Sequence, residues 1–96
     1  MKIRNVAHRG LRRFMQQNDV SSLPPSVVEK VRNILTFLQE MEDAQELRDV
    51  PSWNAHQLTG DRKGSWSLTV TRNWRITFRI DQTEGEILDL DYEDYH

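Results

Sequence analysis

The sequence predicts an α+β fold in which helices pack on one face of a mainly antiparallel sheet. Two observations lead to this prediction. Apolar residues recur at helical spacing in the first half of the chain, whereas from residue 52 onwards they alternate with polar residues, as in strands. The length of 96 residues suits one domain with a single core, so we expect one domain over residues 1–96.

The first half of the chain is expected to form a short strand and then two helices. The opening segment MKIRNVA is apolar at alternate positions, which predicts the strand. A short helix should follow within residues 8–19, where Leu11, Phe14 and Met15 have helical spacing. The second helix is marked by a longer apolar stripe, formed by Val27, Val28, Val31, Ile34, Leu35, Leu38 and Met41.

The second helix should begin near residue 25, and two explanations of its start are open. Ser26 and Glu29 could form a capping box, in which each side chain satisfies a free backbone N–H group. Alternatively, Pro24 or Pro25 could occupy the first turn, where a missing N–H group costs nothing.

The segments SWSLTVT and WRITFRI are expected to form a hairpin. A loop of Thr71, Arg72 and Asn73 brings both apolar sets to one face, whereas a two-residue loop would put them out of register. The predicted pairs are Val70–Trp74, Leu68–Ile76 and Trp66–Phe78, with Asn73 in the left-handed conformation. This parity also places both tryptophans in the core.

The same register predicts a cationic face that carries hydroxyl groups, with Thr69 opposite Arg75, Ser67 opposite Thr77 and Ser65 opposite Arg79. The final segment EILDLDYEDYH should form the last strand, packed through Leu88, Leu90 and Tyr92.

Charge is segregated along the chain despite a net charge of −2. Residues 1–13 and 62–79 carry cations and no acidic residue, whereas acidic residues concentrate in 40–49 and 81–94. Such a chain can present a positive groove, although an ordinary mosaic surface gives the same counts. The absence of cysteine excludes disulfides and thiolate metal sites, and His8 and His56 lack neighbours at ligand spacing. With neither a signal peptide nor a membrane-spanning run, we expect a soluble cytoplasmic protein without metal or cofactor.

Two arginines on the hairpin are candidates for binding phosphate. Arg75 and Arg79 are two residues apart on a strand, so their side chains project from one face about 7 Å apart. A guanidinium group binds phosphate as a fork, but exposed arginines also serve solubility. The loop GDRKG, residues 60–64, holds two further cations between glycines and is either a ligand-binding loop or a simple turn.

The sequence ends in DYEDYH, whose last two side chains differ as proton acceptors. A free histidine, with a pKa near 6.5, is mostly neutral at pH 7, whereas a free tyrosine is ionised in about one molecule per thousand. His96 is therefore the better proton acceptor and Tyr95 the better hydrogen-bond donor or stacking group. A terminal Tyr-His pair can also be incidental.

Taken together, LTGDRKGSWSLTVTRNWRITFRI and the terminal DYEDYH resemble the HigB toxins of the RelE/ParE superfamily of bacterial toxin–antitoxin modules. In that family a loop of the kind L-x-GDR-x-G precedes a WS-I/L-x-V segment, then NWRI, then a terminal DYH or EDYH. The resemblance is dense from Leu58 to His96. It implies a RelE-like fold, with an N-terminal strand and two helices packed on a mainly antiparallel sheet of about four to five strands.

The resemblance implies a ribosome-dependent endoribonuclease that cuts messenger RNA in the decoding site, by attack of a ribose 2′-OH on the adjacent phosphate and without a metal. Carried over by position, Arg75 stabilises phosphate, and the terminal Asp94, Tyr95 and His96 orient, donate or stack, and shuttle the proton. The residues expected to hold the RNA backbone are Arg62, Lys63, Arg72 and Arg79. Which of Tyr95 and His96 moves the proton is open.

The implied partner is an antitoxin of the HigA kind, with a helix-turn-helix fold, through which the toxin would reach operator DNA. Two other functions compete with the nuclease. ParE-type toxins of the same superfamily inhibit DNA gyrase by protein contact, and a decayed toxin would only bind its antitoxin. Some relatives carry Lys where this chain has Thr59, which keeps the second alternative open.

Overall fold

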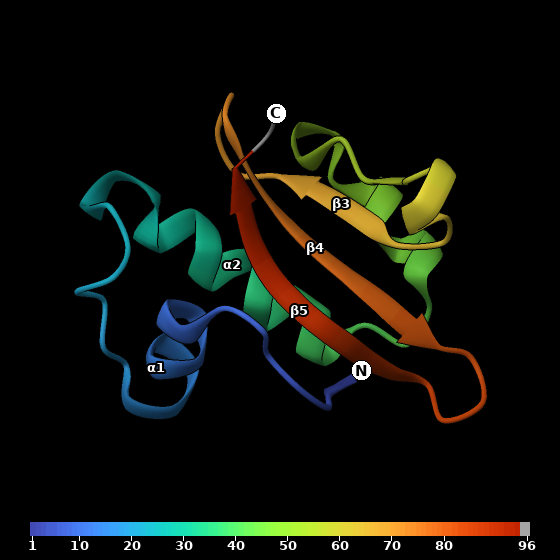
Figure 1. The fold of residues 1–96 in the computed structure, drawn as a ribbon, viewed down its shortest axis with the longest axis horizontal. Helices are drawn as coiled ribbons and strands as arrows, with labels where there is room; N and C mark the ends of the chain where they lie inside the picture. Colours follow the sequence, from blue (N-terminus) through green and yellow to red (C-terminus); the bar gives the residue numbers. More distant parts are fainter. Residues whose placement is uncertain (95–96) are drawn as a thin grey trace.

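The computed structural model describes residues 1–94 and shows one mixed sheet with two helices packed beside it (Figure 1). The sheet has five strands in the order β1-β5-β4-β3-β2. Strand β1 runs parallel to β5 and every other neighbouring pair is antiparallel, which confirms the predicted α+β class. The elements are β1 (Lys2–Ile3), α1 (Arg9–Gln17), α2 (Val28–Glu40), β2 (His56–Gln57), β3 (Trp66–Thr69), β4 (Trp74–Asp81) and β5 (Glu86–Asp94).

Four short 3-10 helices complete the chain. They are η1 (Pro25–Val27), η2 (Ala44–Asp49), η3 (Pro51–Trp53) and η4 (Gly60–Arg62). Within residues 1–94, no helix is both long enough and apolar enough to span a membrane.

A single core lies between the helices and the sheet. Val31, Ile34 and Leu38 of α2 are fully buried, and Leu11 of α1 joins them. The opposing sheet face contributes Leu68, Ile76, Phe78, Ile87 and Leu90 to the same cluster. The apolar side of the helices therefore packs on the apolar face of the sheet, as the sequence predicts.

The start of α2 follows the proline explanation. Pro25 occupies the first turn of η1, which leads directly into α2, and neither helix has a side-chain cap. The capping box of Ser26 and Glu29 is therefore not formed. Helix α1 begins differently, because Nδ1 of His8 accepts a hydrogen bond from the N–H group of Leu11 at 3.1 Å.

The hairpin of β3 and β4 has the predicted register, with Leu68 opposite Ile76 and Trp66 opposite Phe78. The prediction of a left-handed Asn73 was wrong, because Asn73 does not have a positive φ. The N–H groups of Val70 and Thr71 both donate to the carbonyl of Trp74, at 2.9 and 3.0 Å. Two successive residues that donate to one carbonyl form a β-bulge, in which Val70 and Thr71 both lie opposite Trp74. The turn therefore closes without a positive φ at Asn73.

A second bulge changes the parity of β5. Thr77 pairs with Asp91 but Arg79 pairs with Leu88, so the pairing register shifts between them, and Asp89 has a φ of 55°. As a result Ile87 and Leu90 both face the core, whereas Leu88 is only half-buried. The prediction that Leu88 packs in the core was therefore wrong, and those for Leu90 and Tyr92 are confirmed.

Candidate active site

The sheet face opposite the helices carries the predicted cationic side chains. Because facing residues of neighbouring strands share a side, Thr69, Arg75 and Glu93 form one row across β3, β4 and β5. The next row runs from His56 on β2 through Ser67 and Thr77 to Asp91. Two rows of polar side chains therefore lie side by side on this face.

The centre of the face is occupied by an ion pair between Arg62 and Glu93. The guanidinium group donates to both carboxylate oxygens, at 2.8 and 2.6 Å, and Thr77 donates a further hydrogen bond to the same carboxylate. Hydrogen bonds from Arg62 lower the pKa of Glu93; burial opposes this shift, and the nearby charge of Arg75 adds to it. A carboxylate from β5 therefore neutralises Arg62, one of the cations of the segment 62–79.

The sequence predicts four hydroxyl-bearing residues on this face, of which three are buried and one, Thr69, is half-buried. Ser65, Ser67 and Thr77 are all buried, and Thr77 lies within reach of both Arg62 and Glu93. The loop that contains η4 brings Arg62 to the sheet, which a strand-by-strand analysis of faces does not anticipate. The exposed side chains on either side of the ion pair include the cations Lys63, Arg72 and Arg79 and the acidic residues Asp61 and Asp89.

A hollow of about 260 Å³ lies at the hairpin end of the face. Among its lining residues are two of the predicted site, Arg72 and Arg75, together with His56 and Trp74. A second hollow, of about 400 Å³, holds the other three predicted cations, Arg62, Lys63 and Arg79. Arg79 is held by Asp89, with nitrogen–oxygen distances of 2.6 and 3.0 Å.

The predicted catalytic residues are only partly described. Asp94 ends β5, where it pairs in register with Trp74, one residue before Arg75. Arg75 is half-buried beside Glu93. Tyr95 and His96 lie outside the described residues. The structure therefore places Arg75 and the end of β5 at the same end of the sheet.

No pattern in the sequence indicates a role for His56, yet this residue lines the hollow with Arg75. Its side chain is exposed, and Nδ1 lies 2.8 Å from the carbonyl oxygen of Asn54. Because a carbonyl can only accept, Nδ1 carries the proton, and Nε2 of the neutral ring is left as a proton acceptor. The only sequence signal is its place two residues before the L-x-GDR-x-G segment, since a two-residue strand shows no alternation.

Trp74 also departs from the prediction. It is 37% exposed, whereas Trp66 is 3% exposed, so the prediction of a core position was right for Trp66 alone. Trp74 has the parity of the core face, but it begins β4 at the hairpin end of the sheet. Its ring is stacked on Tyr92, with centroids 4.7 Å apart.

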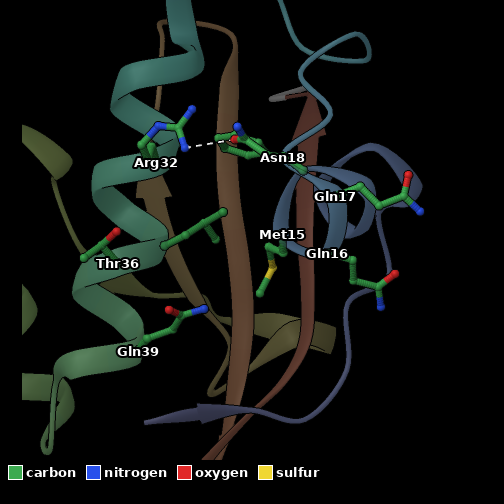
Figure 2. A pocket seen from close by; sticks show the side chains of 9 residues that line it. Met15, Gln16, Gln17, Asn18, Arg32, Thr36 and Gln39 are labelled. Atoms are coloured by element: carbon green, nitrogen blue, oxygen red, sulfur yellow. Dashed lines mark hydrogen bonds between the residues drawn. The ribbon is translucent and has the colours of Figure 1, made fainter.

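A third hollow, of about 420 Å³, lies on the helical side of the molecule, between α1 and α2 (Figure 2). Arg32 of α2 donates a hydrogen bond of 3.1 Å to Asn18, the C-cap of α1, and its guanidinium group lies 4.8 Å from the Phe14 ring. Arg32 is the one charged group among the described residues that line it. This lining offers neither an acid–base pair nor a second cation, so we place no chemistry there.

No group of three His, Asp or Glu side chains within residues 1–94 is arranged to hold a metal ion.

The fold is shared with a bacterial toxin of known structure. The structure is similar to a YoeB/ParE toxin from Agrobacterium tumefaciens, with a TM-score of 0.53 over 100% of this chain and 99% of that one. The two sequences are 16% identical, so this likeness concerns the fold alone.

The sequence itself narrows the class. Residues 4–96 match the model of the HigB-like toxins, described as RelE-like toxins of the type II toxin–antitoxin system HigB. The chain is also 36% identical to the endoribonuclease HigB of Proteus vulgaris, across 98% of this chain and 99% of that protein. It therefore belongs to the HigB-like toxin family, and membership of a type II system implies an antitoxin partner.

Proposed function

We propose that this toxin is an endoribonuclease that cuts messenger RNA on the ribosome, in the cytoplasm, by attack of a ribose 2′-OH on the adjacent phosphate. The relative from Proteus vulgaris is named an endoribonuclease, and the resemblance to it spans nearly the whole chain. The single structural observation that carries the proposal is the hollow in which Arg75, Arg72 and His56 lie together. It joins two cations and a proton acceptor at one accessible place.

The chemistry needs a base for the 2′-OH, positive charge for the developing phosphorane and an acid for the departing 5′-oxygen. Arg75 supplies the charge, because its guanidinium group can bind two phosphate oxygens as a fork. Asp94 orients the terminal groups, Tyr95 donates or stacks, and His96 shuttles the proton. His56, with Nε2 available as an acceptor, is a second candidate for the base. These groups move protons themselves, so the mechanism uses no metal.

The remaining cations bind the RNA backbone in this proposal. Arg72 and Lys63 are exposed, and each lines one of the two hollows on this face. Arg62 and Arg79 are ion-paired to Glu93 and Asp89, so they would exchange a carboxylate for a phosphate when RNA binds. The partner in this proposal is an antitoxin of the HigA kind with a helix-turn-helix fold. It binds the toxin either on this face or on another surface. Operator DNA would be reached only through that antitoxin.

Cleavage by the purified chain, on ribosomes that carry a defined messenger RNA, tests this proposal. Arg75→Ala should slow single-turnover cleavage by about 10²–10³-fold, the usual cost of losing one preorganised charge donor at a transition state. Arg9→Ala is the matched control, because Arg9 is exposed on α1 and outside both hollows. A wild-type rate for Arg75→Ala would remove Arg75 from the mechanism. Failure of the wild-type chain to cut any ribosome-bound RNA would contradict the proposed function itself.

A further inference from the structure

Trp74 is the exposed tryptophan of this chain. Of the three tryptophans, Trp53 and Trp66 are buried at 7% and 3% exposure, whereas Trp74 is 37% exposed. One other large apolar side chain among the described residues, Val20, is comparably exposed, and it lies in the loop after α1. A single exposed apolar residue is ordinary by itself. The position of Trp74 is what distinguishes it, because it lines the cationic hollow with Arg72 and Arg75.

The indole ring of Trp74 is held in place from beneath. It stacks on the ring of Tyr92, with centroids 4.7 Å apart and planes 21° apart. Tyr92 is 5% exposed, and the ring of His8 packs edge-on against it at 5.6 Å. Burial raises the pKa of Tyr92, so its ring stays neutral. A ring supported in this way loses little side-chain entropy when a ligand packs against it.

We propose that Trp74 stacks on a base of the RNA next to the scissile phosphate. The inference rests on the proposed function, and it identifies Trp74 as the residue that binds the base beside the bond that is cut. The side chains of Trp74 and Arg75 project from opposite faces of β4, but both residues line the hollow at the hairpin end of the sheet. An RNA strand that crosses this end, with a phosphate bound by Arg75, therefore brings a neighbouring base onto the ring of Trp74. Cations that follow the backbone, interleaved with an aromatic ring, are the arrangement with which proteins hold single-stranded RNA.

This contact selects for the presence of a base more than for its identity. An indole ring offers a π face and one N–H donor, and every base has a π face to place against it. We therefore expect RNAs that differ only in the base at this position to be cleaved at similar rates. Removal of the base should be felt, since it leaves the ribose and the phosphates but takes away the stacking partner.

Two substitutions separate stacking from simple apolar bulk. Trp74→Leu keeps an apolar side chain without a π face, and Trp74→Phe keeps the π face. Stacking of one base on an aromatic ring corresponds to a factor of about 5–150. On ribosomes that carry a defined messenger RNA, Trp74→Leu should slow single-turnover cleavage within that range, and Trp74→Phe should recover most of the loss. Val20→Ala, which changes the other exposed apolar side chain, should cut at the wild-type rate.

The decisive measurement combines these variants with RNAs that carry one abasic nucleotide, moved along the codon. At the stacked position, the abasic site should slow the wild-type chain by the same factor as Trp74→Leu, and the two changes together should cost no more than either alone. Multiplicative losses at every position would overturn the proposal. A wild-type cleavage rate for Trp74→Leu, with weaker antitoxin binding, would overturn it in favour of a protein-binding role for this ring.

Thermal unfolding of each variant guards against a trivial loss of fold. If Trp74→Leu does not fold, the abasic series with the wild-type chain still decides, because one position must be far more sensitive than its neighbours. Equal sensitivity at all positions would then reject the stacking contact. These outcomes differ from failure of the proposed function, in which the wild-type chain cuts none of the RNAs, abasic or intact.

Discussion

At the scale of single residues, Glu93 organises the cationic face of the sheet. Its carboxylate binds both terminal nitrogens of Arg62 and accepts from Thr77, so three elements meet at one side chain. A pair of this kind joins positions 31 residues apart, which no local pattern reveals. In consequence the strand register predicts where Arg75 and Arg79 lie, but not that the loop of η4 brings Arg62 to Glu93.

The lowered pKa of Glu93 makes the stability of the fold depend on pH. A carboxylate whose pKa falls on folding adds stability that is fully present above the unfolded pKa and is lost as the pH falls through the folded one. We therefore expect Glu93→Gln to lower the free energy of unfolding by about 1 kcal/mol at pH 7, a value discounted for partial exposure. This deficit should shrink as the pH falls below about 4.

Urea denaturation of both proteins at pH 7 and pH 3.5 measures this deficit. Asp61→Asn is the control, since Asp61 is an exposed carboxylate on η4, and it should change the free energy of unfolding by no more than about 0.5 kcal/mol. A deficit for Glu93→Gln that is equal at both pH values would show that the ion pair does not contribute to stability.

At the scale of elements, α1 contains a glycine that packing requires. Replacing Gly with Ala inside a helix normally stabilises by up to about 1 kcal/mol. At Gly10, however, the new Cβ would lie 2.7 Å from Cβ of Ser22 and 2.9 Å from the His8 ring. We expect Gly10→Ala to lower the free energy of unfolding by about 1–3 kcal/mol, the usual cost of overpacking.

The companion variant Gly10→Ala/Ser22→Gly removes the closer of these contacts and should recover part of the loss in the same chemical denaturation. A more stable Gly10→Ala protein would mean that helix propensity outweighs the contact and that α1 does not pack as tightly as described.

The bulge in β5 gives a second test, at Asp89. Inside a strand, Gly is normally less stable than Ala by about 0.5–1 kcal/mol. Asp89 has a φ of 55°, a conformation that Gly adopts without strain and that costs Ala about 1–2 kcal/mol. Both substitutions remove the contacts with Asn5 and Arg79 equally. We therefore expect Asp89→Gly to be more stable than Asp89→Ala, and thermal unfolding of the pair checks the order. An Asp89→Ala protein that is more stable than Asp89→Gly, as expected in a regular strand, would argue against the bulge.

The same elements show how far patterns in the sequence reach. The register of the β3–β4 hairpin follows from alternation together with a short loop, because a three-residue loop brings both apolar faces to one side and a two-residue loop does not. The bulge at Asp89 does not, since an aspartate with a positive φ looks like any other aspartate in the sequence. For Trp74, alternation assigned the core face correctly but carried no information on where burial ends along the sheet.

At the scale of the whole molecule, the two segregated charge sets fold onto one another. Arg4 binds Asp81 and Glu86, while Arg62 and Arg79 bind carboxylates of β5. Within residues 62–79, these ion pairs involve Arg62 and Arg79, whereas Arg72 and Arg75 line the hollow at the hairpin end. His56, which the sequence analysis missed, lies in that hollow because β2 joins the edge of the sheet there.

The central claim is that this toxin cuts RNA with groups gathered around Arg75 and the end of β5. Controlled expression in cells, followed by mapping of new 5′ ends on messenger RNA, tests it most directly. Three chains would be compared: the full chain, Arg75→Ala, and a chain stopped after Asp94. We predict growth arrest with new cuts inside reading frames for the full chain alone. Growth arrest by all three chains without new cuts would contradict the claim and favour a gyrase-type target.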